Sequence, residues 1–164
     1  MFRSVTLPRD ISGRLYLHSM PGRNEAWSDF IAEAERCSIQ VIVCLATDNE
    51  IEMKSPSYED AIKSGRFSYC KQCFPISDYS VPQDREEYTA FVERIARLLR
   101  SGHTVLVHCG AGIGRTGTFA ICLLLALGLN RVEAHKAIRD AGSSPETKEQ
   151  REMVSWCEEK FHAA

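Results

Sequence analysis

The chain has 164 residues, of which 44% are hydrophobic, so it is large enough to form the core of one domain, and we expect that domain to cover residues 1–164. A formal net charge of -2 and the lack of any block of like charges exclude a general attraction to nucleic acid or acidic membranes, so an anion site must be local. Seven scattered cysteines without the spacing of a disulfide framework, and an N-terminus without the apolar core of a signal peptide, indicate a cytoplasmic protein.

The first half of the chain predicts strands that alternate with helices. Short apolar runs predict three strands, at residues 14–20, 39–46 and 66–74. Between the first two strands, the spacing of Trp27, Phe30 and Ala34 is that of a helix. A short helix is expected around residues 58–63, and a loop punctuated by two prolines, residues 75–84, follows the third strand.

The third predicted strand contains a CxxC pair, Cys70 and Cys73, a spacing found in redox and zinc sites. Residues three apart on a strand face opposite sides of the sheet, and no second pair of ligands follows in the sequence. We therefore expect no metal site and no cofactor.

The second half of the chain predicts helices around one buried strand. An apolar stripe predicts an amphipathic helix over residues 84–100, and the apolar centre of residues 103–108 is typical of a central parallel strand covered on both faces. Further helices are expected at residues 116–127, 131–141 and 145–161, the last with Ser143 or Ser144 as N-cap and Pro145 in its first turn. The order of elements predicts a three-layer α/β domain, with a central, mostly parallel sheet flanked by helices and a helical C-terminal third.

Between the buried strand and the next helix lies the stretch HCGAGIGRTG, residues 108–117. Backbone N–H groups at such a helix N-terminus can turn inward around one point and bind an anion. The glycines permit a close turn and leave room for an oxyanion against bare backbone. We therefore predict a phosphate-binding loop formed by Gly110, Ala111, Gly112, Ile113, Gly114 and Arg115.

Two side chains of this stretch supply chemistry. The positive field of a helix N-terminus favours a thiolate over a thiol, which makes Cys109 a candidate nucleophile. Arg115 adds a planar fork of donors that can hold two oxygens of a phosphate, a geometry that lysine could not reproduce. A nucleophile and an oxyanion clamp thus converge on one tetrahedral group.

The same stretch resembles the signature of the cysteine-dependent protein tyrosine phosphatases. His108, Cys109, Arg115 and Thr116 match the motif H-C-x5-R-[ST] of that superfamily, in register and at a strand-to-helix turn. The resemblance extends in order and rough spacing over residues 14–160 and implies the phosphatase fold of that family.

Two further segments are similar to the small dual-specificity branch of this superfamily. Asp78, in FPISDYSVP, resembles the general acid of its mobile loop, and GSSPETKEQ resembles the segment that carries a glutamine, which points to Gln150. Asp84 is the alternative acid, although its position at the start of the amphipathic helix suits an N-cap better.

The resemblance implies a two-step phosphoryl transfer that needs no metal. Cys109 attacks phosphorus while Asp78 protonates the leaving oxygen, and Asp78 then accepts a proton from the water that hydrolyses the cysteinyl phosphate. Gln150 positions that water, Thr116 hydrogen-bonds the sulfur, and His108 supports the loop without transferring protons.

The loop composition bears on the substrate class. Gly110, Ala111, Ile113 and Gly114 include no lysine, whereas branches of the superfamily that act on inositol phospholipids tend to have basic residues there. We expect a monomer whose substrates are phosphoproteins or phosphopeptides carrying phosphotyrosine, and phosphoserine and phosphothreonine stay open.

Three other functions fit part of the pattern. An enzyme acting on an RNA 5′ phosphate uses a similar signature, but the chain has no excess of basic residues. A sulfur-transfer enzyme also has a reactive cysteine in an anion-binding loop, but it does not need an acid such as Asp78. A non-enzymatic phosphate-binding module is expected to have lost Cys109, Arg115 or Asp78, and all three are present.

Overall fold

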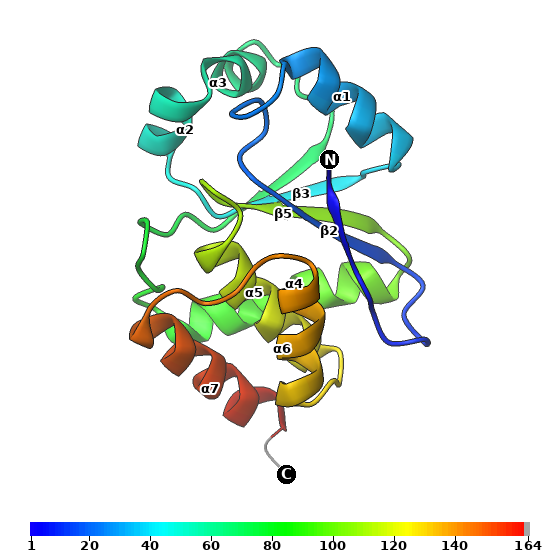
Figure 1. The fold of residues 1–164 in the computed structure, drawn as a ribbon, viewed down its shortest axis with the longest axis vertical. Helices are drawn as coiled ribbons and strands as arrows, with labels where there is room; N and C mark the ends of the chain where they lie inside the picture. The colour runs from blue at the N-terminus through cyan, green and yellow to red at the C-terminus, as the bar shows by residue number, and fades with distance from the viewer. Residues whose placement is uncertain (163–164) are drawn as a thin grey trace.

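Five strands form one central sheet in the computed structural model, which describes residues 1–162 (Figure 1). The strands are β1 (Arg3–Val5), β2 (Arg14–His18), β3 (Val41–Cys44), β4 (Cys70–Cys73) and β5 (Thr104–His108). Their order across the sheet is β1-β2-β5-β3-β4; β1 is antiparallel to β2, and the other pairs are parallel. The predicted mostly parallel sheet with β5 at its centre is confirmed, whereas β1, a short edge strand, was not predicted.

Helices cover both faces of the sheet, as Figure 1 shows. On one face lie α1 (Trp27–Arg36), α2 (Asp48–Lys54) and α3 (Pro56–Lys63). On the other face lie α4 (Arg85–Arg100), α5 (Gly114–Ala126), α6 (Arg131–Asp140) and α7 (Lys148–His162). The expected three layers and the helical C-terminal third are therefore confirmed.

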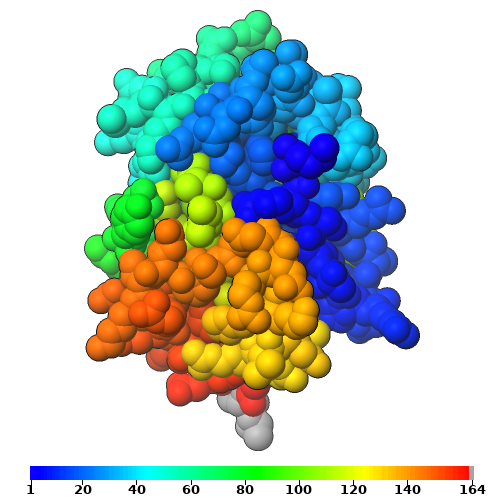
Figure 2. All heavy atoms as spheres, in the orientation of Figure 1, coloured from blue at the N-terminus to red at the C-terminus, as the bar shows by residue number. Residues whose placement is uncertain are grey.

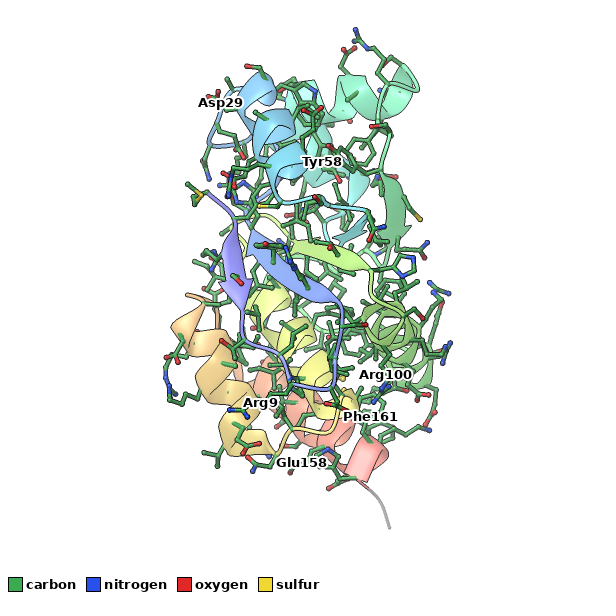
Figure 3. All side chains as sticks on the ribbon, turned by 90° about the vertical axis from the view of Figure 1, so that its right-hand side faces the viewer. Arg9, Asp29, Tyr58, Arg100, Glu158 and Phe161 are labelled. Carbon is green, nitrogen blue, oxygen red and sulfur yellow. The ribbon has the colours of Figure 1, made fainter. Side chains whose placement is uncertain are left out.

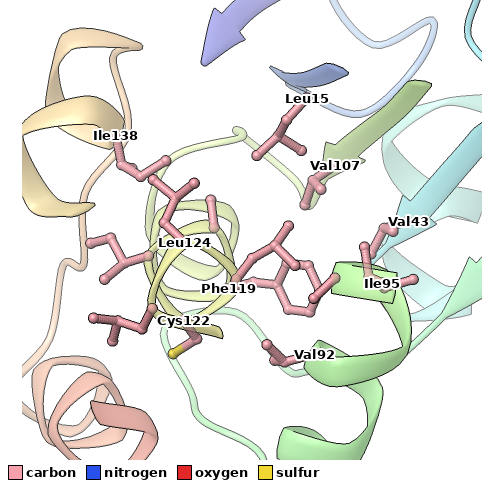
Figure 4. Close-up of a cluster of buried hydrophobic side chains, with 14 of the residues drawn as sticks. Leu15, Val43, Val92, Ile95, Val107, Phe119, Cys122, Leu124 and Ile138 are labelled. Carbon is pink, nitrogen blue, oxygen red and sulfur yellow. The ribbon is translucent and has the colours of Figure 1, made fainter. Parts of the chain in front are cut away.

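The buried helix α5 is the centre of the larger core, shown in Figure 4. Phe119 packs toward Val92 and Ile95 of α4, while Leu124 lies near Ile138 of α6. All five residues of β5 are buried too, so the strand before the predicted phosphate-binding loop and the helix after it are both enclosed by apolar side chains. Among the described residues no helix, α5 included, is long and apolar enough to cross a membrane.

An aromatic cluster fills the space between the sheet and α1–α3. Trp27 of α1 stacks on Tyr58 of α3 with ring centroids 6.0 Å apart, and Phe67 packs on the same tyrosine at 5.5 Å. Figure 3 shows Tyr58 on this side of the sheet. Its ring is fully buried, and it reaches the end of β5, where the predicted phosphate-binding loop begins.

The structure corrects three predicted boundaries. The predicted strand 66–74 shortens to β4, and the short helix expected around residues 58–63 begins at Pro56, after a further helix, α2, that was not predicted. The last helix begins at Lys148 rather than at residue 145, so neither Ser143 nor Ser144 caps it and Pro145 precedes it. Thr147 takes that role instead, because its hydroxyl accepts from the Gln150 N–H at 3.1 Å and its own N–H is bound by the Gln150 side chain at 3.3 Å.

Candidate functional site

The loop between β5 and α5 encloses the sulfur of Cys109. This cysteine is 2% exposed, and the Gly112 N–H donates to its Sγ at 3.3 Å. Within residues 1–162 no side chain caps the N-terminus of α5, so its first N–H groups stay available at the loop. A thiol surrounded by free backbone donors is the arrangement expected of an anion cradle.

The carbonyl groups of the loop are bound on its outer side. The Cys109 carbonyl accepts from His108 Nδ1 at 3.0 Å, the Gly110 carbonyl from the Met20 N–H at 3.0 Å, and the Ile113 carbonyl from the Gly117 N–H at 2.8 Å. A trans peptide places its N–H opposite its C=O, and the described chain contains no cis bond. Each of these carbonyls therefore directs the N–H of the following residue to the side of the peptide opposite its own partner.

Gly112 is required by two features of the loop. Its φ of 78° lies in the left-handed region, which side chains with a Cβ rarely adopt. A Cβ at this position would also lie 2.3 Å from the carbonyl oxygen of His18, at the end of β2. The loop can thus approach β2 closely only with glycine here.

Arg115 lies buried at the start of α5 and meets Glu50, a residue that the sequence analysis did not identify. Its Nη1 and Nη2 donate to the two carboxylate oxygens of Glu50 at 2.6 and 2.8 Å, and Nη1 also donates to the Ile76 carbonyl at 2.7 Å. Its Nε is buried and has no partner among residues 1–162. Glu50 and the Ile76 carbonyl thus hold the guanidinium of Arg115 in place, while its Nε stays available for a ligand.

The carboxylate of Glu50 is the fixed counter-ion of this arginine. Burial raises the pKa of Glu50, but the hydrogen bonds from Arg115 and from the Thr47 N–H outweigh it and lower the pKa to about 2. Glu50 thus stays ionised at neutral and moderately acidic pH. Its position follows from a capping box, Thr47-x-x-Glu50, at the start of α2. This sequence pattern predicts the start of a helix, but it does not indicate that Glu50 binds Arg115.

The structure brings Asp78 to the site and leaves Asp84 outside it. Asp78 Oδ1 lies 3.2 Å from Arg115 Nη2, and the Asp78 side chain is 44% exposed, so it can reach both the cradle and solvent. Asp84 accepts from the Glu87 N–H at 3.0 Å and is the N-cap of α4, as its sequence position suggested. Geometry therefore favours Asp78 as the carboxyl group of the site.

Thr116 and Gln150 are both buried; within the described chain Thr116 does not make the contact expected of it, and Gln150 binds backbone groups. The predicted hydrogen bond from Thr116 to the sulfur is absent, and within the described chain its Oγ1 has no partner; the Gly112 N–H contacts the sulfur instead. The side-chain oxygen of Gln150 accepts from the Glu146 N–H at 2.6 Å, and its amide nitrogen lies 3.5 Å from the Ser80 carbonyl. Gln150 thus ties the start of α7 to the loop that carries Asp78.

His108 is fully buried beneath the loop in one defined tautomer. Its Nδ1 donates to the Cys109 carbonyl, and its Nε2 accepts from the Tyr58 hydroxyl at 2.9 Å. Burial keeps the Tyr58 hydroxyl protonated by raising its pKa, and burial also lowers the pKa of His108 to about 4. The neutral ring supports the loop from below, which fits the role that the resemblance implied.

This buried neutral histidine predicts a pH-dependent stability. Since the unfolded chain binds a proton near pH 6.5 and the folded chain only near pH 4, folding stability should fall by about 2 kcal/mol between pH 7 and pH 5. His108→Gln should remove most of that difference, as measured by urea unfolding at both values. His103→Gln, at a half-buried position just before β5, is the control; an unchanged pH difference in His108→Gln would contradict this explanation.

Comparison with known proteins identifies relatives of this architecture. A family model described as "Swiss Army Knife protein, DSP-PTPase phosphatase domain" (PTP-SAK) matches residues 11–160. Receptor-type tyrosine-protein phosphatase V of Rattus norvegicus is 40% identical over 62 residues, 36% of this chain and 3% of that protein. A protein of Invertebrate iridescent virus 6 named as a candidate tyrosine phosphatase, 197R, is 34% identical over 82 residues, 47% of this chain and 30% of the relative. The chain thus spans less than a third of the length of these curated relatives.

Solved structures share the fold over almost the full chain. Kinase associated phosphatase (KAP), with serine in place of its catalytic-site cysteine, has a TM-score of 0.82 at 23% identity, covering 100% of this chain and 97% of that one. Tk-PTP in its active form has a TM-score of 0.73 at 26% identity, covering 96% and 97% of the two chains. At 23% identity, the similarity to KAP concerns the fold alone.

Proposed function

Since the chain belongs to the family of DSP-PTPase phosphatase domains, we propose that it hydrolyses phosphotyrosine in proteins through a cysteinyl-phosphate intermediate. The observation that carries this proposal is the convergence of three groups. The Cys109 sulfur lies inside the loop, the buried Arg115 fork lies at the start of α5, and the Asp78 carboxyl group lies 3.2 Å from that fork. A nucleophile, an oxyanion clamp and a proton donor are the parts that phosphate-ester hydrolysis through a thiolate requires.

In the first step the Cys109 thiolate attacks phosphorus and displaces the ester oxygen. The backbone N–H groups of residues 110–115 and the free Nε of Arg115 hold the equatorial oxygens, whose charge grows as the bonds change. Asp78 gives its proton to the leaving oxygen, so that a neutral alcohol or phenol departs. The product is a phosphate bound to sulfur and an ionised Asp78.

In the second step water attacks the cysteinyl phosphate. Asp78, now ionised, accepts a proton from that water, inorganic phosphate forms, and the sulfur leaves as the thiolate. Thr116, whose buried hydroxyl has no partner within residues 1–162, can turn to donate to the departing sulfur. Gln150 acts here by fixing the loop of Asp78 through Ser80, as well as by positioning water.

The surroundings of the site support a singly phosphorylated protein as substrate. Glu50 and Asp78 contact Arg115, and the carboxylate of the exposed Glu146 lies over Gly114. These three carboxylates balance in number the cations at the loop, which are Arg115, Lys54 and Arg3, so the site has no surplus of positive charge for a substrate with several phosphates. Tyr79, next to Asp78, is exposed and offers an aromatic face to a phosphotyrosine ring.

Phosphate release from a substrate panel tests this proposal. The panel contains matched phosphotyrosine, phosphoserine and phosphothreonine peptides, an inositol phosphate and a triphosphate-ended RNA, each with Cys109→Ser beside the unaltered chain. We expect release from the phosphotyrosine peptide by the unaltered chain alone, and the ratio among the peptides measures dual specificity. Release from the inositol phosphate or the RNA without release from peptides would retain the chemistry and overturn the substrate, and no release at all would favour a phosphate-binding module.

A further inference from the structure

Arg3 lies in β1, before the segment that the family model matches, and it reaches the outer side of the phosphate-binding loop. Figure 2 shows the dark-blue N-terminal segment beside the orange residues that follow α6, on the face where the yellow-green loop reaches the surface. Strand β1 pairs with β2 in fixed register, with Arg3 opposite Leu17. The sheet therefore holds the Arg3 backbone at a defined distance from the loop.

The guanidinium of Arg3 joins two segments of the chain. Its Nη2 donates to the Gly112 carbonyl at 2.7 Å, and its Nη1 donates to the Ala141 carbonyl at 2.8 Å and to Ser143 Oγ at 2.9 Å. Ser143 Oγ in turn donates to the same Gly112 carbonyl at 2.6 Å. The side chain passes so close to Gly142 that a Cβ there would lie 3.0 Å from Nη1. The absence of a Cβ at Gly142 leaves room for the Arg3 guanidinium in the turn after α6.

The Gly112 carbonyl determines the orientation of one donor of the cradle. Glycine has no Cβ to restrict its peptide, so the C=O of Gly112 and the N–H of Ile113 could rotate together about the chain. A carbonyl held outward turns the Ile113 N–H inward, because the two groups are antiparallel in a trans peptide. Two donors on one oxygen, one of them charged, fix this orientation more strongly than either alone.

We infer that Arg3 is a positioning residue of the phosphate site, which locks the peptide between Gly112 and Ile113 in the anion-binding orientation. The inference rests on the proposed function, because the anion concerned is the phosphate of the substrate. Arg3 also lies close enough to Cys109 for their charges to interact. Burial lowers the pKa of Arg3, and the negative charge of an ionised Cys109 opposes this effect. Arg3 touches neither phosphate nor the reacting atoms in this role.

Inorganic phosphate binding, measured by titration calorimetry well below the unfolding temperature, tests the inference. Arg3→Gln should weaken phosphate binding roughly tenfold and lower kcat/KM on the phosphotyrosine peptide by a similar factor. Arg14→Gln, at an exposed position on β2, should bind and turn over like the unaltered chain. A residue that only stabilised the fold would lower the unfolding temperature of Arg3→Gln but leave its phosphate affinity unchanged, and that result would overturn the inference.

A second variant keeps the test decisive if Arg3→Gln does not fold. Arg3→Lys retains the charge, but its single ammonium nitrogen cannot span the acceptors that Nη1 and Nη2 of Arg3 reach separately, so its phosphate affinity should fall between those of Arg3→Gln and the unaltered chain. Unaltered affinity in a folded Arg3→Lys would overturn the inference in the same way. Because phosphate binding does not require turnover, a chain that binds phosphate through Arg3 but releases none from peptides would refute the proposed function and retain this role of Arg3.

Discussion

Cys109→Ser is expected to lower turnover of a phosphotyrosine peptide by at least about four powers of ten, to the background of the assay. A serine hydroxyl is far less acidic than a thiol at the same helix N-terminus, so it supplies almost no anionic nucleophile. The exchange of sulfur for oxygen leaves the backbone donors and Arg115 in place. Steady-state phosphate release, together with a search for a phosphorylated intermediate by mass spectrometry of quenched samples, measures the loss.

The same variant should retain substrate binding. Without a thiolate facing the phosphate dianion, Cys109→Ser should bind the phosphotyrosine peptide as tightly as the unaltered chain or more tightly. Cys70→Ser, on the exposed edge strand β4, is the matched control and should keep full activity. Turnover close to that of the unaltered chain in Cys109→Ser would exclude the cysteinyl-phosphate route, whatever the fold.

The parts of the site that could be predicted are those whose residues are close together in the sequence. The wholly apolar run of β5, the glycines after it and the apolar helix α5 follow one another without interruption, so their physical requirements determine a strand, a turn and a buried helix. Cys109 and Arg115 share this short segment, and their proximity follows from the turn itself. The fold class followed in the same way from the alternation of strands and helices.

Glu50 and Arg3 could not be found in this way, because their function depends on segments distant in sequence. Glu50 sits in a capping box of α2, and nothing in that local pattern indicates a bond to an arginine on α5. Arg3 belongs to a three-residue edge strand, too short for a period-two pattern to be recognised. The contact of Arg3 with Gly112 depends on the pairing of β1 with β2, and the contact of Glu50 with Arg115 depends on the packing of α2 beside the loop.

Gln150 shows a different reason for an incomplete prediction. Its position was identified from a resemblance, while the residues around it, Thr147-x-x-Gln150, also carry the signature of a capping box. The capping role is seen directly in the structure, because the buried Gln150 amide binds backbone groups at the start of α7. The same Gln150 side chain also lies 3.5 Å from the Ser80 carbonyl, in the loop of Asp78. Capping the helix and supporting the Asp78 loop are therefore two functions of one side chain.

Asp78→Asn is expected to lower kcat by roughly two to four powers of ten on the phosphotyrosine peptide and on alkyl phosphates. An asparagine of nearly the same shape keeps the 3.2 Å approach to Arg115 but cannot give a proton to the leaving oxygen. The loss should therefore shrink for an aryl phosphate whose phenol is acidic enough to leave without protonation. Measuring kcat over a series of leaving groups yields a steeper dependence in Asp78→Asn than in the unaltered chain.

Asp84→Asn is the control that separates the two aspartates of this loop region. Asn is as good an N-cap as Asp, so the bond to the Glu87 N–H and the start of α4 should persist, and kcat should stay within about twofold for every leaving group. If Asp78→Asn instead lost equal activity on all leaving groups, proton donation would have to come from another residue, and Asp78 would act through Arg115 alone. If Asp84→Asn acquired the steep leaving-group dependence, the acid would be Asp84, and the loop would have to close further over the site than it does in this structure.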